Sequence, residues 1–362
     1  MAVVLPPREG FGPGRAGAIG LVVQRLCAVR GFRTVVIGGP QDGPTFPGIE
    51  LCTARPPFWR PGNINARYAA GVATLLRRLQ PDLVEVHNRT EVALALARHW
   101  SAERISLFLH NDPQAMRRAR TPAERGRLLR RLGRVVTVSH YLRDRLLDGV
   151  TAPHAPVAVL PNGIDLAAIE NTGRAERLML FVGRVVPEKA PDAFVAACAI
   201  ALPQLPGWRA EIIGADRFRI DSPETGFVRR VRQAADRAGV PLLGYLDHPA
   251  VLAALARAAI VVVPSRWAEP FGLTALEGMA AGAALICSPR GGLPEVAGGA
   301  ALYADPDDPT RIAAAMIRLA RDADLRQTLA AAGRTRARQF DLPVILERLE
   351  VLRRNSLALA CG

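Results

Sequence analysis

Residues 265–277 have the sequence SRWAEPFGLTALE and follow, after Pro264, an apolar run of four β-branched residues, 260–263. Such a run predicts a buried parallel strand, and the apolar residues from 275 to 281 predict a helix. The segment is therefore expected to form a strand end, a loop and a helix start. In parallel α/β sheets, ligands bind outside the carboxyl ends of the strands, which is where this loop lies.

The loop combines an anion site with two carboxylates. The backbone N–H groups of Gly272, Leu273 and Thr274 are expected at the start of the helix, where a phosphate is favoured, and Thr274 is expected to cap that helix. Glu269 and Glu277 suit hydroxyl groups, which a nucleotide sugar carries on both sides of its diphosphate. Two alternatives stay open: Glu277 closes a capping box with Thr274, and Glu269 is an exposed loop acid.

Length and composition indicate a folded protein of two domains. The chain has 362 residues, of which 49% are hydrophobic, and this composition argues against disorder. Its five cysteines form no close pair, so neither a disulfide framework nor a metal site is expected. No apolar run is long enough for a membrane span or a secretory signal, so we expect the protein in the cytoplasm.

The charge balance favours anionic partners. The chain has 47 basic and 33 acidic residues, a net charge of +14. Lys189 is the only lysine, and the other basic residues are all arginine. A single lysine in so arginine-rich a chain points to a position that needs a compact, mobile ammonium group.

Strand-like and helix-like segments alternate in two series, which predict an α/β fold with two Rossmann-like doubly wound domains facing a cleft. The expected domains are residues 1–163 and residues 164–340, with a C-terminal helix at 341–362 that returns toward the first domain. The expected strands are 3–5, 34–37, 82–86, 105–109, 134–138, 157–160, 178–182, 210–213, 242–243, 260–263, 284–286 and 301–303, and residues 310–355 are expected to be helical.

Two cations follow the first strand of the second series. Arg184 and Lys189 lie in the loop after residues 178–182, at the same sheet edge as Glu269. A guanidinium and an ammonium group there can neutralise a diphosphate leaving group as its charge develops. The alternative is that both are solvated loop cations.

These motifs resemble the retaining glycosyltransferases of family 4, which have the two-Rossmann GT-B fold. The resemblance is carried by Gly183-Arg184, Glu188-Lys189, Pro264-Ser265 and the segment from Glu269 to Glu277. Further matches are PNGID at 161–165, TVS at 137–139 and GGLPE at 291–295. The similarity extends over nearly the whole chain and is more specific in the second half. The resemblance makes residues 1–163 the acceptor domain and residues 164–340 the donor domain.

The resemblance implies roles for individual residues in the second half. Arg184 and Lys189 would hold the donor diphosphate, Glu277 the ribose, and Glu269 the hydroxyls of the donor sugar. Backbone amides of Phe271, Gly272 and Leu273 would complete the phosphate site.

In the first half the resemblance places His110 opposite the donor sugar and Gly17 in a glycine loop near the phosphates. Taken alone, a histidine at a strand end is more often an ordinary polar residue. The glycine loop, residues 10–17, also matches the GxGxxG pattern of nicotinamide-binding proteins. The strand at 34–37 ends without an acid for ribose, so a substrate loop or a plain turn is favoured instead.

The implied function is transfer of a sugar from a UDP-sugar or GDP-sugar to a glycan or lipid-linked acceptor, in synthesis of a surface polysaccharide or lipopolysaccharide. The resemblance implies retention by front-face attack without a bound metal, with no cofactor besides the donor. A nucleotide-sugar epimerase is an alternative enzyme. A nucleic-acid binder is disfavoured, because aromatic residues are only 5% and do not alternate with the arginines.

The segment from Arg117 to Arg134 contains eight arginines and one acid, Glu124. Leu128, Leu129 and Leu132 form an apolar stripe beside them. This pattern predicts either a helix on the inner face of an anionic membrane or a solvated helix whose leucines pack on the first domain.

Overall fold

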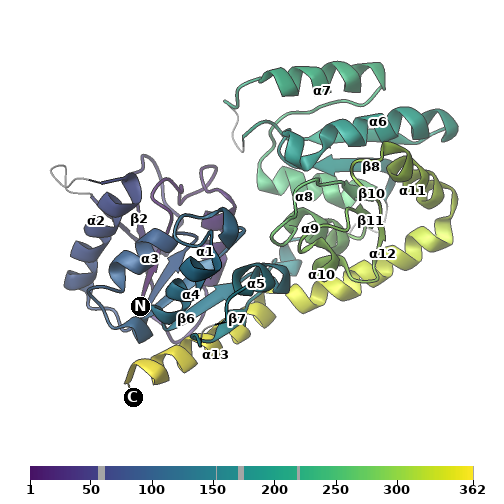
Figure 1. Cartoon of the computed structure of the whole chain (residues 1–362). Coiled ribbons are helices and arrows are strands. Elements are labelled where there is room, and N and C mark those ends of the chain that lie inside the picture. Colours follow the sequence, from purple (N-terminus) through teal and green to yellow (C-terminus); the bar gives the residue numbers. More distant parts are fainter. Residues whose placement is uncertain (56–61, 152, 170–174, 218–220, 362) are drawn as a thin grey trace. The chain divides into compact units, whose positions relative to one another are not determined.

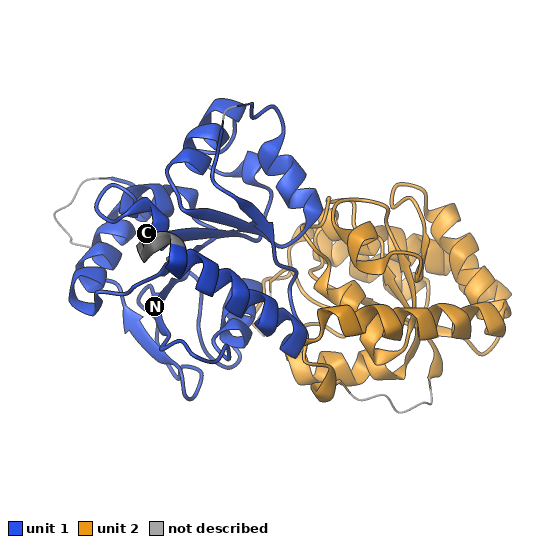
Figure 2. Cartoon of the chain, turned by 90° about the horizontal axis from the view of Figure 1, so that it is seen from below, with its two compact units in different colours: residues 1–163, 342–362 blue, residues 164–341 orange. Residues whose placement is uncertain are grey.

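The computed structural model describes residues 1–55, 62–151, 153–169, 175–217 and 221–361. The chain divides into two compact units (Figure 2). Unit 1 consists of Met1–Gly163 and Leu342–Gly362, and unit 2 of Ile164–Asp341. No helix within the described ranges has the length and apolar character needed to cross a membrane.

Unit 1 is a seven-stranded parallel sheet covered by helices (Figure 1). Its strand order is β3-β2-β1-β4-β5-β6-β7. Strands are added on one side of β1 up to β3 and on its other side from β4 onward, so the switch point lies between β1 and β4. Apolar residues on one face of these strands pack against helices as one cluster, and those on the other face of β1 and β2 form a second, smaller cluster. The strands are β1 (Ala2–Val4), β2 (Val35–Gly38), β3 (Glu50–Thr53), β4 (Val84–His87), β5 (Ile105–Leu109), β6 (Arg134–Thr137) and β7 (Val157–Val159), and the helices are α1 (Ala18–Leu26), α2 (Ile64–Leu79), α3 (Thr90–Leu96), α4 (Pro122–Arg130), α5 (His140–Leu147) and α13 (Leu342–Cys361).

Unit 2 is a five-stranded parallel sheet in the order β12-β11-β10-β8-β9. Strand β9 is added on one side of β8 and the strands from β10 onward on its other side, so the switch point lies between β8 and β10. The loops that follow these two strands leave the sheet at this point. The strands are β8 (Glu176–Val182), β9 (Arg209–Ile213), β10 (Ala258–Val263), β11 (Ala284–Cys287) and β12 (Ala301–Tyr303), and the helices are α6 (Pro191–Ala201), α7 (Gly226–Arg237), α8 (His248–Arg257), α9 (Leu273–Ala281), α10 (Leu293–Ala297), α11 (Pro309–Arg321) and α12 (Ala323–Ala337).

One expected element is corrected. Residues 242–243 are not a strand, because only Leu242 forms a bridge, with Ile212, and Leu243 is exposed. The region from 310 onward is helical as expected, and it consists of three α-helices, of which α13 is the expected C-terminal helix. Asp322 ends α11 and accepts a hydrogen bond from the amide of Leu325 as the cap of α12, and Asp341 interrupts the chain again before α13.

The C-terminal helix α13 is fastened to unit 1 by a buried ion pair. Arg353 donates two hydrogen bonds of 2.8 Å to the carboxylate of Glu85 on β4, and both side chains are almost fully buried. The guanidinium also lies 5.6 Å from the ring centre of Phe32. Because each buried charge satisfies the other, loss of either partner leaves an uncompensated charge in the interior.

Replacing Arg353 with alanine is expected to lower the free energy of unfolding by about 3–5 kcal/mol, since Glu85 then stays buried without a partner. Urea denaturation would measure the change. Arg354→Ala is the matched control, because Arg354 pairs with Glu350 on the exposed face of the same helix. Its loss should cost less than about 1 kcal/mol. Equal effects of the two substitutions would contradict the assigned role.

Candidate functional site

The loops after β8 and β10 are joined at the switch point of unit 2 by hydrogen bonds to one carbonyl oxygen. The Glu188 carbonyl accepts from the amide of Trp267 (3.0 Å) and from the hydroxyl of Ser265 (3.1 Å). These bonds place the lysine that follows Glu188 beside the segment 265–277. The arrangement results from the parallel strand order, which brings the ends of β8 and β10 to the same edge.

Lys189 and Glu269 form an ion pair at this edge. The Nζ atom of Lys189 lies 2.5 Å from Oε1 of Glu269 and 5.2 Å from the ring centre of Trp267. The side chains are 21% and 7% exposed. Glu269 is thus a buried, paired acid, and the alternative of an exposed loop acid is wrong. The contact at Oε1 leaves the second carboxylate oxygen for a hydroxyl donor.

The backbone of Glu269 is held by a close approach of two loops. Its carbonyl accepts a hydrogen bond of 2.6 Å from the amide of Gly292. Gly291 has φ +66°, and a Cβ atom there would lie 2.3 Å from the Glu269 carbonyl oxygen. Only glycine fits at position 291, because a side chain there would collide with the Glu269 carbonyl and keep the two loops apart.

The helix α9 begins at Leu273, and Gly272 is its N-cap in the left-handed conformation, with φ +108°. The expected cap by Thr274 is therefore wrong, because Thr274 is already the second helical residue. No side chain caps the helix. The first N–H groups, those of Leu273 and Thr274, therefore have no partner within the helix and are oriented to bind an anion.

Arg184 is half-buried in the loop after β8, and its side chain has no hydrogen-bond or ion-pair partner among the described residues. Phe271 is buried, with its ring edge-on to Phe340 at 5.6 Å. Phe271 therefore anchors the loop through its side chain. Within the described ranges, no group of three or more His, Cys, Asp or Glu side chains is arranged to hold a metal ion.

Glu277 has a partner that the sequence did not indicate. Its Oε1 lies 2.9 Å from Nε2 of His248, the first residue of α8. The capping-box alternative is wrong, since Glu277 is the fifth residue of α9 and Thr274 is not the cap. Nothing in the sequence relates His248 to Glu277, because the contact depends on how α8 packs against α9.

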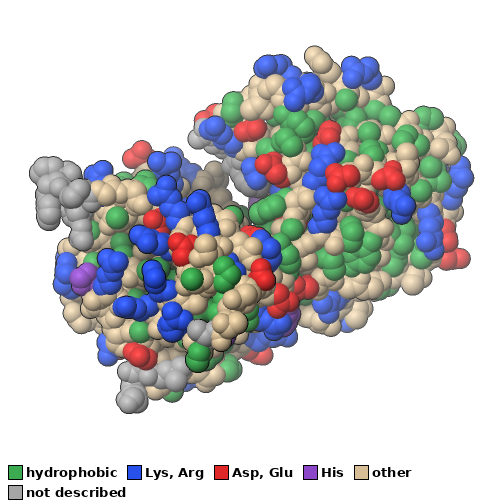
Figure 3. All heavy atoms as spheres, in the orientation of Figure 1, with side chains coloured by type: hydrophobic (Ala, Val, Ile, Leu, Met, Phe, Trp, Pro, Cys, Tyr) green, Lys and Arg blue, Asp and Glu red, His purple; other side chains and the backbone are tan. Residues whose placement is uncertain are grey.

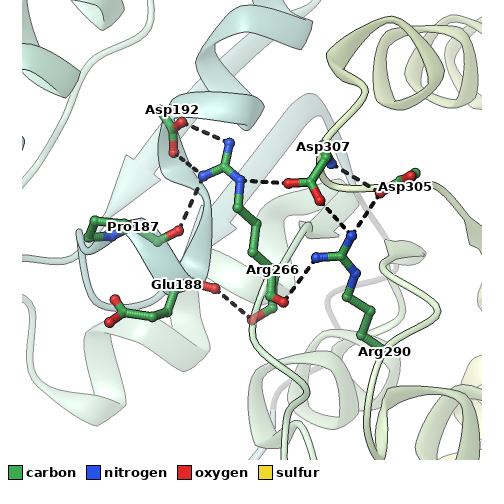
Figure 4. A network of polar contacts seen from close by, with 8 residues as sticks. Pro187, Glu188, Asp192, Arg266, Arg290, Asp305 and Asp307 are labelled. Atoms are coloured by element: carbon green, nitrogen blue, oxygen red, sulfur yellow. Dashed lines mark hydrogen bonds and ion pairs between the residues drawn. The ribbon is translucent and has the colours of Figure 1, made fainter.

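A network of arginine and aspartate side chains braces the same edge (Figure 4). Arg266 forms two bonds of 2.8 Å to Asp192 at the start of α6 and one of 3.0 Å to Asp307 after β12. Arg290, which follows β11, binds Asp307 at 2.6 Å and Asp305 at 3.1 Å. These bonds connect the segments that follow β10, β11 and β12 with the start of α6. They thereby fix the loop after β10, which carries Glu269.

In unit 1, Gly17 is the N-cap of α1. The carboxylate of Glu9 accepts a hydrogen bond of 2.8 Å from the amide of Gly20 in the first turn of that helix. Burial raises the pKa of Glu9, and the bonds from Gly20 and Gly17 oppose this shift. The helix end that the family resemblance assigns to phosphate therefore already has an anionic partner from its own chain.

His110 lies beside a second histidine at the switch point of unit 1. Nδ1 of His87, the last residue of β4, is 2.9 Å from Nε2 of His110, which follows β5. The amides of His110 and Asn111 both donate to Oδ1 of Asn88 at 3.2 Å. Burial lowers the pKa of His87 to about 3, helped by the charge of Arg353, and burial followed by the effect of His87 lowers the pKa of His110. Both rings are therefore neutral near pH 7.

The leucines of the arginine-rich segment 117–134 are buried in the core of unit 1, so of the two alternatives for this segment the structure has the one in which the leucines pack on the first domain. Leu128 and Leu129 are fully buried and Leu132 is nearly so, so this apolar stripe cannot enter a lipid surface. Arg125 is buried as well and donates to backbone carbonyls. Basic side chains are spread over this face of unit 1 with acidic ones among them (Figure 3). Those of the segment that are exposed are Arg117, Arg118, Arg120, Arg127, Arg130 and Arg131.

Two family models match the chain one after the other. Glycosyltransferase Family 4 matches residues 21–168, and Glycosyl transferases group 1 matches residues 166–336. The chain belongs to this glycosyltransferase family. The group 1 match contains Arg184, Lys189, Glu269 and Glu277, and the family 4 match contains His110.

The chain is similar in sequence to curated glycosyltransferases and in structure to solved ones. Glycogen synthase of Mycobacterium tuberculosis (strain CDC 1551 / Oshkosh) is 30% identical over 238 residues, 60% of this chain and 55% of that protein. The chain spans about half the length of the curated relatives it matches. Sucrose-phosphate synthase from Thermosynechococcus elongatus has a TM-score of 0.79 at 22% identity and 99% coverage of both chains. Anabaena Alr3699/HepE, solved in complex with UDP, has a TM-score of 0.77 at 19% identity, covering 98% of this chain and 99% of its own. The expected GT-B type of α/β fold is confirmed.

The two neutral histidines predict a loss of stability in mild acid. Each has a folded-state pKa below its unfolded value near 6.5, so the unfolded state takes up protons that the folded state does not. The free energy of unfolding should fall by roughly 2 kcal/mol between pH 7 and pH 5.5 on account of this pair. Urea denaturation across this pH range would measure it.

The variant His87→Phe should reduce that pH dependence to about half, because one of the two proton-binding differences is removed. His99→Phe is the control, since His99 is exposed. A wild-type pH dependence in His87→Phe would contradict the assignment.

Proposed function

We propose that this chain is a retaining glycosyltransferase that moves a sugar from a nucleoside-diphosphate sugar to a hydroxyl group of a glycan or lipid-linked acceptor. The observation that carries the proposal is the Lys189–Glu269 pair beside the uncapped start of α9, at the switch point of unit 2. Family membership supplies the reaction class. The residue chemistry supplies a site for phosphate next to a site for hydroxyls.

The donor would be held by groups of opposite character. Arg184 and Lys189 would neutralise the diphosphate together with the N–H groups of Leu273 and Thr274. The free oxygen of Glu269 would accept a hydrogen bond from a hydroxyl of the transferred sugar. The free oxygen of Glu277 would do the same for the ribose, while His248 holds the other oxygen.

In the reaction, the bond between the anomeric carbon and the diphosphate oxygen would break as the acceptor oxygen attacks the same face of the sugar. The acceptor proton would pass to the departing phosphate oxygen. Negative charge grows on the diphosphate during this step, so preorganised cations at Arg184 and Lys189 would stabilise the transition state more than the ground state.

We propose a UDP-sugar or a GDP-sugar as donor, with UDP-sugars favoured because the neighbour HepE was solved with UDP. The proposed acceptor belongs to the synthesis of a cell-surface polysaccharide or lipopolysaccharide, on the cytoplasmic side of the membrane. The exposed arginines of the segment 117–131 support this choice, since basic side chains near an anionic lipid surface each contribute about 1 kcal/mol of attraction. That attraction would be by charge alone.

A thermal-shift screen would test the donor directly. A ligand that binds the folded state raises the melting temperature in proportion to its occupancy. UDP, GDP and their sugars should therefore raise it, and ADP serves as a comparison. An absence of any shift with all nucleotides would contradict the proposed donor site.

The variant Lys189→Ala should reduce turnover of the donor about a hundredfold or more, since it removes a preorganised positive charge from the leaving group. Release of nucleoside diphosphate from the donor found in the screen would measure it. Arg311→Ala removes the same charge from an exposed position of unit 2 and should leave turnover unchanged. Circular dichroism and the melting temperature of Lys189→Ala show whether an effect comes from misfolding, because this variant leaves Glu269 without its partner. Wild-type turnover in folded Lys189→Ala would exclude the assigned role.

The variant Glu277→Ala should weaken binding of UDP or GDP about tenfold while leaving binding of the 2′-deoxy nucleotide nearly unchanged, since only ribose offers the lost hydroxyl contact. Isothermal titration calorimetry with the four nucleotides would measure this. His248→Ala should show a smaller effect of the same kind. Equal losses for ribose and deoxyribose forms would mean that Glu277 acts on the fold and not on the sugar.

A further inference from the structure

Three aromatic rings lie together on one face of the unit 1 sheet. His87 on β4 is directly opposite Phe108 on β5, and His110 follows Phe108 by two residues, so all three side chains share a face. The rings of His87 and Phe108 are 4.8 Å apart and those of His87 and His110 are 5.2 Å apart, both nearly parallel. Phe108 thus lies against a face of the His87 ring, and His110 meets the edge of that ring through the nitrogen contact of 2.9 Å.

The outer nitrogen of each histidine has no partner. Nε2 of His87 and Nδ1 of His110 are buried and form no hydrogen bond with the residues that the structure describes. His110 is 8% exposed and His87 is fully buried. An unsatisfied buried polar atom costs roughly 1–3 kcal/mol, so such an atom at a strand end points to a ligand that completes it.

The contact between the rings couples the tautomers of the two histidines. A neutral imidazole carries one N–H, and the 2.9 Å contact requires one proton between Nδ1 of His87 and Nε2 of His110. If His87 donates, then His110 must carry its own proton on Nδ1 and present a donor there. If His110 donates, then its Nδ1 is a bare acceptor. In either case the character of Nδ1 in His110 is set by His87.

We propose that His87 is the positioning residue of His110, fixing its ring orientation and tautomer so that Nδ1 is the atom that binds a sugar hydroxyl. A hydroxyl group both donates and accepts, and it therefore satisfies either tautomer. The role in transfer rests on the proposed function, but the tautomer of His110 does not.

The surroundings of the pair favour a fixed arrangement. The backbone at His110 is tied by the two amide bonds to Asn88, which itself adopts a left-handed conformation with φ +55°. The low pKa values of both rings, caused mainly by burial, keep the pair neutral, so the two coupled tautomer pairs are available and a charged form is not. A histidine without this neighbour would be free to exchange its proton between Nδ1 and Nε2.

Nitrogen-15 NMR of the histidine rings tests the proposal on the full chain, with His110→Gln used to assign the resonances. Wild-type His110 should show one tautomer. His87→Phe keeps the stacked ring but removes Nδ1, and His110 should then show a mixture of tautomers. His87→Asn places an amide near the position of Nδ1 and should restore a single tautomer. Circular dichroism and melting temperature report whether each variant folds.

The second readout is release of UDP from UDP-glucose. His87→Phe should lower kcat about tenfold at nearly unchanged KM for the donor, with partial recovery in His87→Asn. An unchanged tautomer of His110 in both variants would overturn the proposal. A changed tautomer with wild-type kcat would exclude a role for His87 in transfer. If wild-type protein releases no UDP, the proposed donor fails, while the NMR result still decides whether His87 positions His110.

Discussion

The ion pair between Lys189 and Glu269 is the contact on which the geometry of the candidate site in unit 2 depends. Burying a carboxylate as deeply as that of Glu269 is costly unless a cation pairs with it, and Lys189 from the neighbouring strand end is that cation. The parallel strand order brings the loops after β8 and β10 to one edge, and the ion pair joins them there. The bonds to the Glu188 carbonyl and the glycine at 291 then follow as means of holding those loops. A lysine suits the position because a compact ammonium reaches both Glu269 and the face of Trp267.

The two units carry different chemistry at equivalent edges of their sheets. Unit 2 presents Lys189, Arg184 and an uncapped helix start, which together form a positive site. In unit 1 the start of α1 is already bound by Glu9, and the neighbouring strand ends carry two neutral rings. An anion is therefore favoured at the edge of unit 2, and a neutral hydroxyl group at the ring nitrogen of His110.

The sequence predicts the sheets well and the contacts between side chains poorly. The strand at 105–109 matches β5 and the strand at 301–303 matches β12, because long apolar runs signal buried parallel strands. The edge strand β3 has half-exposed residues and gave no such signal. The position of Lys189 near Glu269 followed from strand ends meeting at one edge, but their pairing did not. The partners His248 and His87 depend on the packing of separate elements, which no local pattern encodes.

The C-terminal helix links folding of unit 1 to the chemistry of its strand ends. Glu85 and His87 are two residues apart on β4, so their side chains face the same side of the sheet. Arg353 of α13 packs against this side. The guanidinium is bound by Glu85, yet its charge still contributes to the low pKa of His87. A cation placed there opposes protonation of His87, so the contact with His110 joins two neutral rings. Helix α13 thus supports the neutral histidine pair as well as completing the core.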